Sequence, residues 1–404
     1  MAAAGGLLFC ASAFADTTNY YWKDGQGNGR WDWSTNQWFI DGGGNVGVPR
    51  SDGGAILFFQ GNGTTNTFIN SGFTSGYFNL NSIILDSGSS GRNYTISVEN
   101  GGTGLQFFNK IETQAGGGSL TVNSVTQLGA DAVVNAFGGT ITLGQVQTNG
   151  KTLTVDGGSN TSFGDVINGP GTGSVQKNGT GTLTFGGSSD NLNVAATVNG
   201  GTLILNKTSS SSVHAVGAGL TVNSGGTVSL GGSGGDQIFN SMAVTMNGGT
   251  FRPNGHSEGT GSTSLNGLVL SGSSSNGIGA LTLQSNSTLD FGAAGVGTLT
   301  FASFSRTAGT LNILNYTNTT ESVALQRSGI DGTDDRLIFN QDQASNLAFF
   351  SFNGISATEI ALGGGFFEIV PIPEASTWVS ATLSLVALTA FSQRRRVLAR
   401  RKKL

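Results

Sequence analysis

The sequence has little charge, almost no cysteine and almost no histidine. Charged residues make up 10% of the 404 positions, and the chain holds one cysteine, Cys10, and two histidines. About 25% charge is typical of soluble domains. A lone cysteine excludes a disulfide framework, so stability must come from strand pairing and stacked apolar residues. The low charge also argues against a charge-driven disordered chain.

The few basic residues are concentrated at the carboxyl end. Seven of the 19 Lys and Arg residues lie in the last 11 positions, and all 23 acidic residues precede them. The remaining body therefore carries 12 bases against 23 acids, a net charge of −11. An acidic body repels phosphate backbones, so we expect no nucleic-acid partner.

The motifs of common enzyme classes are missing. No G-x-S-x-G elbow, phosphate loop or dinucleotide fingerprint occurs in the necessary structural context. His214 and His256, 42 residues apart, are interpreted as ordinary surface residues. The acids of the central region are scattered singly, at Asp131, Asp156, Asp165, Asp190, Asp236, Glu258 and Asp290. We therefore expect no catalysis and no cofactor. The alternative is a β-helix polysaccharide lyase or glycoside hydrolase, which needs clustered carboxylates with a base or second acid nearby.

What the sequence does have is glycine, 67 residues in all, punctuating a repeated unit. The unit occurs as AATVNGGTLIL, GLTVNSGGTVSL and AVTMNGGTFRP. Its Gly-Gly-Thr triplets begin at Gly200, Gly225 and Gly248, spaced by 25 and then 23 residues. Alternating apolar and polar residues bounded by Gly and Asn indicate short strands, and a repeat of this length is typical of a solenoid.

The predicted fold is all-β, a parallel β-helix (β-solenoid) over residues 55–306. No segment there shows helical spacing over ten or more residues. Alternation alone would also allow a large antiparallel sandwich. The short regular period, with few Asn-Gly hairpins between strands, favours the coil. In it Leu203 and other alternate apolar residues would fill the interior, and an aspartate at this position would cost several kcal/mol.

The amino terminus predicts an export signal followed by a cap. Residues 1–15 are small and apolar and end in an A-x-A cleavage site formed by Ala13 and Ala15. A buried terminal strand is the alternative. Residues 16–54 contain four of the five tryptophans, Trp22, Trp31, Trp33 and Trp38. Bulky aromatics can seal the open end of a solenoid, which favours an aromatic cap; a carbohydrate-stacking platform is the alternative.

Two stretches resemble a known family. GTGSVQKNGTGTLTFGG (171–187) followed by Thr197 to Leu203 resembles the autotransporter-associated β-strand repeat, and the likeness is clearest over 171–253. The tryptophan-rich lead-in, with Pro49 and the strand at 55–59, is similar to the start of secreted bacterial proteins that carry this repeat. The resemblance implies a right-handed parallel β-helix.

After a closing β unit at 307–370, the last segment predicts a membrane tail. Within 371–404, residues 376–393 are uncharged and are followed at once by Arg394, Arg395 and Arg396, in a basic end at 394–403. Eighteen helical residues extend about 27 Å, enough for one transmembrane helix. The arginines would act as the cytoplasmic stop and leave the body outside. An amphipathic or buried terminal helix is the alternative.

This tail resembles the PEP-CTERM sorting signal, with Pro373, Glu374 and Ala375 where the signal has Pro-Glu-Pro. The resemblance implies a Gram-negative exported protein sorted by an exosortase-like enzyme, with an inner-membrane intermediate before the cell surface or extracellular matrix. The expected function is structural or adhesive, with exopolysaccharide as a partner. The third position departs from the signal, and this departure bears on cleavage more than on membrane delivery.

One stretch matches a metal motif. Residues 231–239, GGSGGDQIF, fit the nonapeptide calcium pattern with Asp236 as ligand, but neither neighbouring nonapeptide repeats it. We expect no metal site, with Asp236 as the weak calcium candidate. The acidic run Asp331-Gly332-Thr333-Asp334-Asp335 is interpreted as a solvated turn.

Overall fold

The computed structural model describes twelve ranges of the chain, 17–22, 29–31, 38–41, 46–61, 64–69, 76–99, 102–165, 171–208, 213–233, 236–258, 277–318 and 333–372. Several expectations lie outside these ranges: the signal peptide with Ala13 and Ala15, Trp33, and the tail with Pro373, Glu374, Ala375, Arg394, Arg395 and Arg396. Within them, no helix combines the length and the apolar character that crossing a bilayer requires.

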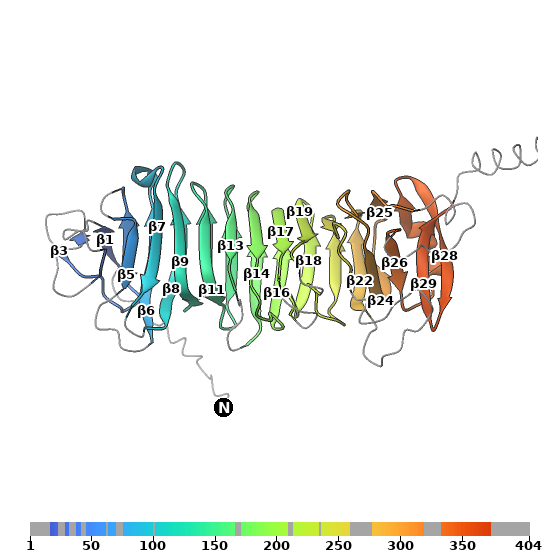
Figure 1. Cartoon of the computed structure of the whole chain (residues 1–404), viewed down its shortest axis with the longest axis horizontal. Coiled ribbons are helices and arrows are strands. Elements are labelled where there is room, and N and C mark those ends of the chain that lie inside the picture. Colours follow the sequence, from blue (N-terminus) through green and yellow to red (C-terminus); the bar gives the residue numbers. More distant parts are fainter. Residues whose placement is uncertain are drawn as a thin grey trace, which may run out of the picture. The chain divides into compact units, whose positions relative to one another are not determined.

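The chain forms two compact units, each built from stacked parallel strands (Figure 1). The first unit contains residues 1–218 and 232–234, and the second contains 219–231 and 235–404. The only helical elements in the described ranges are the 3₁₀ turns η1 (Ser87–Ser89) and η2 (Ala344–Phe349). The predicted parallel β-solenoid is confirmed, and the sandwich alternative is wrong.

The first unit has two series of strands that alternate along the chain. One series is β4 (Ala55–Phe59), β6 (Tyr77–Leu85), β8 (Gly104–Thr113), β10 (Ala132–Ala136), β12 (Thr152–Asp156), β14 (Gly173–Lys177) and β16 (Val194–Val198). The other is β5 (Asn66–Ile69), β7 (Asn93–Val98), β9 (Ser119–Leu128), β11 (Ile141–Gln147), β13 (Thr161–Phe163), β15 (Thr182–Phe185) and β17 (Gly201–Leu205).

Each strand of a series pairs in parallel with the next strand of that series. A strand therefore bonds to the strand two places along the chain, which is the connectivity of a coil. The longer strands also turn a corner, because the start of β8 pairs with the end of β9. Register shifts at Leu80/Ser82 in β6 and at Leu143/Gln145 in β11 mark this corner.

Alternation decides which side chains enter the interior. Leu143, Phe163, Phe185 and Leu205 occupy equivalent positions on four successive strands, and all are at most 1% exposed. The rings of Phe163 and Phe185 stack with centroids 5.8 Å apart and planes 19° apart. Burying such columns of apolar side chains is the main favourable term in a cysteine-poor fold.

Glycine is needed where one turn lies directly on another. A Cβ on Gly200 would lie 2.3 Å from the carbonyl oxygen of Asn178, one coil turn earlier. Gly201 also has a φ of +61°, and a Cβ there would lie 2.4 Å from the carbonyl oxygens of Gly179 and Gly181. A side chain would push successive turns apart, which explains why the repeat is punctuated by glycine pairs.

The second unit follows the same plan. One series is β18 (Gly219–Asn223), β20 (Val244–Asn247), β22 (Ile278–Ser285), β24 (Thr298–Arg306) and β26 (Arg336–Phe339). The other is β19 (Gly226–Leu230), β21 (Thr250–Arg252), β23 (Ser287–Asp290), β25 (Leu311–Leu314) and β27 (Phe350–Phe352). Thr227 pairs with Thr250, so the last two Gly-Gly-Thr triplets lie one above the other, as the period predicts.

Antiparallel strands close one end of each unit. In the first unit, β1 (Thr18–Trp22) pairs in parallel with β4 and antiparallel with β2 (Trp38–Ile40), which pairs with β3 (Val46–Gly47). In the second, the hairpin of β28 (Ile355–Gly363) and β29 (Phe366–Pro371) pairs antiparallel with β27 and β26. These strands cover edges that would otherwise be open to pairing with other chains.

Leu203 tests the stacked interior. Leu203→Asp is expected to lower the free energy of unfolding by several kcal/mol, because it buries an unpaired charge at a position 1% exposed. Thr202→Asp, on the adjacent outward position of β17, is the matched control and should change it by roughly 0.5 kcal/mol or less. Urea unfolding followed by circular dichroism measures both; equal losses would contradict the assignment of Leu203 to the interior.

Candidate functional site

The tryptophans lie inside the closed end of the first unit. Trp22, Trp31 and Trp38 are at most 1% exposed. Trp38 meets Trp22 and Trp31 in edge-to-face contacts, with centroids 4.9 and 5.4 Å apart, and also packs against Phe59. A sugar ring needs an accessible aromatic face, which these three indoles do not offer. Their packing fits an aromatic cap.

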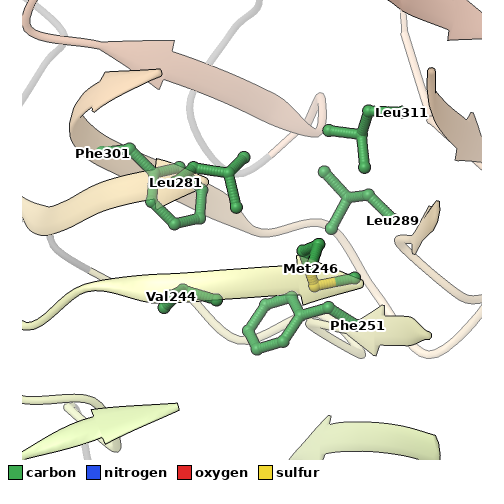
Figure 2. A pocket seen from close by; sticks show the side chains of 7 residues that line it. All are labelled: Val244, Met246, Phe251, Leu281, Leu289, Phe301 and Leu311. Carbon is green, nitrogen blue, oxygen red and sulfur yellow. The ribbon is translucent and has the colours of Figure 1, made fainter. Parts of the chain in front are cut away.

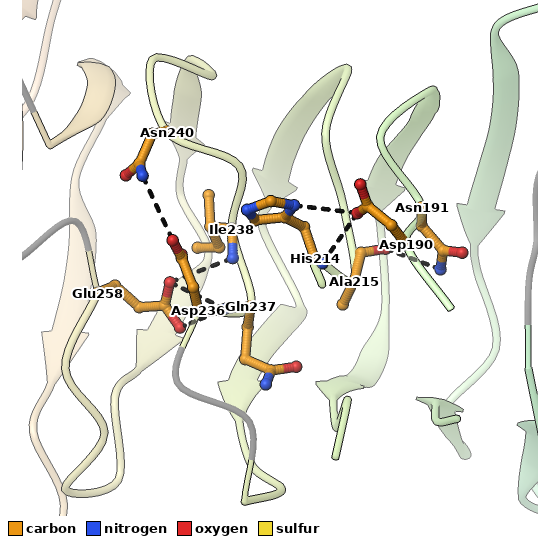
Figure 3. A network of polar contacts seen from close by, with 9 residues as sticks. All are labelled: Asp190, Asn191, His214, Ala215, Asp236, Gln237, Ile238, Asn240 and Glu258. Carbon is orange, nitrogen blue, oxygen red and sulfur yellow. Dashed lines mark hydrogen bonds and ion pairs between the residues drawn. The ribbon is translucent and has the colours of Figure 1, made fainter. Parts of the chain in front are cut away.

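Asp236 meets a second acid, Glu258, in the second unit (Figure 3). Their carboxyls are hydrogen-bonded and both side chains are buried, with Glu258 1% exposed. The Glu258 carboxylate accepts the backbone N–H of Gln237 at 2.8 Å and that of Ile238 at 3.1 Å. We call Asp236 and Glu258 the carboxyl pair.

The carboxyl pair is suited to sharing a proton. Burial, and then the neighbouring Asp236, raises the pKa of Glu258 well above its usual value, because two close carboxylates cannot both ionise cheaply. Calcium would need six to eight oxygen ligands. No cluster of three or more His, Cys, Asp or Glu side chains that could hold a metal occurs in the described part of the chain, and the Glu258 oxygens already accept backbone N–H groups. The pair therefore does not fit the calcium site suggested by the nonapeptide pattern.

A second ionisable group lies in the first unit, around Lys207. The Lys207 side chain is fully buried, and burial lowers its pKa to about 8, against the opposing attraction of Asp165 and Asp190. Asp190 also bonds to His214, with its Oδ1 3.0 Å from Nδ1 of the ring and 2.9 Å from the backbone N of His214. We call Lys207, Asp165, Asp190 and His214 the lysine cluster.

The burial of His214 contradicts its interpretation as a surface residue. It is only 6% exposed and is held in place from one coil turn away. Its carbonyl oxygen accepts the backbone N–H of Asn191, while the side chain of Asn191 donates to the carbonyl of Ala215 at 3.1 Å (Figure 3). His256 is half-buried in the second unit, and burial lowers its pKa.

The acids of the central region are therefore not all single. Asp190 and His214 are 24 residues apart, and Asp236 and Glu258 are 22 apart. Both spacings are one period of the repeat, and one period brings residues side by side in a solenoid. Applying the Gly-Gly-Thr spacing to polar residues would have found both pairs.

Asp334 and Asp335, in the described part of the acidic run before β26, do not face solvent, which corrects the interpretation as a solvated turn for these two residues. Asp334 and Asp335 are at most 1% exposed. The Asp335 carboxylate accepts the backbone N–H groups of Gly297 at 2.9 Å and Thr317 at 2.7 Å. Burial nonetheless raises its pKa. Asp335 thus ties the start of β26 to the preceding turn, which is a structural role.

Next to it, Arg336 and Glu368 form a buried ion pair at 3.0 Å, with side chains at most 3% exposed. Arg336 begins β26 and Glu368 lies on β29, so the pair joins the closing hairpin to the coil. Removing one partner would leave an unpaired buried charge, which is strongly destabilising.

A small interior cavity lies in the second unit (Figure 2). Its lining side chains are all apolar: Val244, Met246, Phe251, Leu281, Leu289, Phe301 and Leu311. It offers no group to orient a substrate and is a packing gap between strands.

Polar side chains on the outside also stack from turn to turn. In the first unit, Gln106 donates to Gln127 at 2.5 Å, and Gln127 donates to Gln147 at 3.0 Å. Tyr77 donates its hydroxyl to Gln147 at 2.8 Å. Such ladders satisfy side-chain amides at the surface and add to the contacts between turns.

Comparison with protein-family models, with curated protein sequences and with solved structures finds no match for this chain. The carboxyl pair and the lysine cluster therefore rest on their own geometry. Lys207 has the lowered pKa of a general base, but its ammonium group is enclosed, so a substrate would reach it only if the surrounding turns opened.

Replacing Lys207 tests its burial. Its folded pKa of about 8 lies below the value of 10.5 usual for lysine, so between these pH values the unfolded chain binds more protons and stability rises with pH. Lys207→Met should therefore be more stable than the wild type at pH 7, by up to about 3 kcal/mol, and the difference should shrink between pH 8 and 10.5. Urea unfolding across this range measures it. Exposed Lys151→Met is the control; identical pH profiles for both variants would contradict the burial.

The carboxyl pair should give the opposite pH dependence of stability from that of Lys207. Because the folded pKa of Glu258 is raised, its favourable contribution is complete below about pH 4.5 and is lost as pH rises. Glu258→Gln should therefore become progressively more stable than the wild type above pH 4.5, by at most about 1.4 kcal/mol per pH unit. Thermal unfolding from pH 4 to 8 measures this, with exposed Asp131→Asn as control. A constant difference between Glu258→Gln and wild type would contradict proton sharing.

Proposed function

We propose that the chain is an exported, non-enzymatic protein of the cell surface or extracellular matrix, with a structural or adhesive role. The observation that carries the proposal is that the polar side chains of this chain form hydrogen bonds from one turn of the coil to the next. Ionisable groups bond to neighbouring turns, as the buried Asp335 and Glu258 and the partly exposed Asp190 do, and outer polar side chains such as Gln106 and Gln127 form ladders. Both serve the stability of a coil without disulfides.

The finer parts of the proposal rest on sequence resemblance and general rules. A right-handed coil is supported by the strong preference of parallel crossover connections for that hand. Export through residues 1–15, membrane insertion through 376–393 and exosortase-like processing near Pro373 and Glu374 belong to the same proposal. Exopolysaccharide is the proposed partner.

A β-helix enzyme that acts on polysaccharide is the second candidate, and the lysine cluster is the observation that favours it. Lyases remove a proton from a sugar ring, which a lysine of lowered pKa beside carboxylates can do. Incubating the protein with uronic-acid polymers tests this. Turnover by the wild type that is abolished in Lys207→Met would establish the enzyme and overturn the structural role.

Deleting residues 373–404 tests the sorting proposal. The full chain should fractionate with membranes or at the cell surface, because its basic end stops translocation. The deletion should instead be released in soluble form. A variant with Arg394, Arg395 and Arg396 replaced by alanine is the matched control, since it keeps the apolar span. Immunoblots of cell fractions measure the distribution; the same distribution for the full chain and the deletion would contradict sorting by the tail.

A further inference from the structure

One sheet of the first unit has an outer face of hydroxyl and amide groups. On β7, β9, β11, β13 and β15, the central outward residue is in each case Thr or Ser. The register places Thr95 beside Thr121, Thr121 beside Thr142, Thr142 beside Ser162, and Ser162 beside Thr184. All five are partly exposed, while their neighbours on the same strands are buried.

A second column runs beside the first, two residues earlier on each strand. It consists of Asn93, Ser119, Thr140, Asn160 and Thr182, and continues to Thr202 on β17, where Ile204 ends the first column. Contacts between turns hold it in line: the Thr140 hydroxyl lies 3.3 Å from Ser119 Oγ, and the Thr182 backbone N–H donates to Asn160 Oδ1 at 3.2 Å. We call the two columns together the hydroxyl face.

The hydroxyl face is a regular array. Adjacent strands in a sheet are about 4.8 Å apart and alternate residues of a strand about 6.7 Å apart, so the side chains form a fixed lattice of donors and acceptors. Because the backbone fixes the lattice, little conformational entropy is lost when a partner binds. Such an array suits a partner that is itself repetitive, since many weak contacts then add up.

The hydroxyl face carries no charge in its two columns, unlike two comparable surfaces of the solenoid. Neither of its columns contains a charged residue. The other sheet of the first unit carries Lys110 and Asp156 on its outward side. In the second unit, Thr227, Thr250 and Thr288 form a similar column, but Arg252 and Asp290 lie beside it as an ion pair at 3.0 Å. A neutral face favours a neutral partner.

An exposed aromatic ring lies beside the hydroxyl face. Phe137 is 49% exposed, in the turn between β10 and β11 that leads into Thr140. A sugar ring can stack on an exposed aromatic ring such as Phe137. It cannot stack on the buried tryptophans. Phe137 directly follows β10 and precedes Thr140 by three residues, so its backbone lies near the second column.

We propose that the hydroxyl face binds a neutral polysaccharide, whose hydroxyl groups pair with the Thr, Ser and Asn side chains and whose ring packs on Phe137. The inference deepens the proposed function and rests on it only for the presence of the polymer outside the cell. Hydroxyls exchange their hydrogen bonds to water for bonds to sugar at little cost, whereas the carboxylates of an acidic polymer would lose hydration and find no cationic group in either column.

The test is binding of the purified full-length protein to named polymers. Amorphous cellulose and galactomannan are the neutral probes, and alginate and polygalacturonate are the acidic ones. Affinity electrophoresis and co-sedimentation should show retention by at least one neutral polymer and none by the acidic polymers. Thr142→Glu should weaken binding about tenfold or more, because it places an unpaired charge against a neutral ligand. Phe137→Ala should also weaken it.

Thr197, outward on β16 in the other sheet, provides the matched control, and Thr197→Glu should bind as the wild type does. Thr142→Val and Thr197→Val remove a hydroxyl without adding charge and cover the case in which Thr142→Glu fails to fold. No retention by the neutral polymers, equal retention by acidic ones, or equal effects at Thr142 and Thr197 would overturn the proposal. Self-association that is lost in Thr142→Val would overturn it too, since the face would then be an interface between copies.

Because this assay uses purified protein, it is independent of sorting in cells. Failure of the deletion of 373–404 to change localisation would reject the proposed export route and leave binding by the hydroxyl face intact. Failure of binding would reject the inference and leave the export proposal standing.

Discussion

In both units, a strand forms its backbone hydrogen bonds with the strand one coil turn away, in register. This constraint places a residue beside one about 20 to 29 positions away in sequence, as Leu183 lies beside Leu203 and Leu220 beside Val244. Where the connecting segment is longer the separation grows, as between Val244 and Leu281. Inward apolar residues then form columns, outward polar residues form ladders, and glycine is required where turn lies on turn. Without disulfides, these repeated contacts are what the fold depends on.

The same constraint explains the buried ionisable groups. One period brings Asp190 beside His214 and Asp236 beside Glu258. Each pair lies where the chain passes between sheets, and each accepts hydrogen bonds from backbone N–H groups. Burying charge is costly, and the raised pKa of Glu258 and the lowered pKa of Lys207 are consequences of that cost. These groups link one turn of the coil to the next.

Much of the fold could be predicted from the sequence, because it depends on local alternation and on a short period. The strand nature of 197–203, the inward position of Leu203 and the stacking of the Gly-Gly-Thr triplets all follow from these two signals. The antiparallel closing strands could not be predicted, since the pairing of β26 with β29 follows neither the repeated unit nor the parallel direction of the coil. The burial of His214, Asp334 and Asp335 was missed because polar residues in Gly-rich turns were assumed to face solvent.

The candidate sites were less predictable for a related reason. The nonapeptide pattern draws attention to Asp236 as a calcium ligand. In the structure its partner is Glu258, one coil turn later, which the pattern does not include. Composition alone allows the tryptophans to form either an aromatic cap or a carbohydrate-stacking platform. The burial of Trp22, Trp31 and Trp38 favours the cap for these three residues. The hydroxyl face needed the register between strands, which no single strand contains.

The central claim is that the first unit is an in-register parallel coil, and one distance tests it most directly. Spin labels on cysteines replacing Asn93 and Thr202, with Cys10 replaced by serine, would lie five strand steps apart on the second column of the hydroxyl face. At about 4.8 Å per step, the backbone separation should be about 24 Å. Pulsed electron–electron double resonance should give one narrow distribution of label-to-label distances close to that value, after allowance for the length of the label side chains. A broad distribution, or a mean tens of Å longer, would contradict the account.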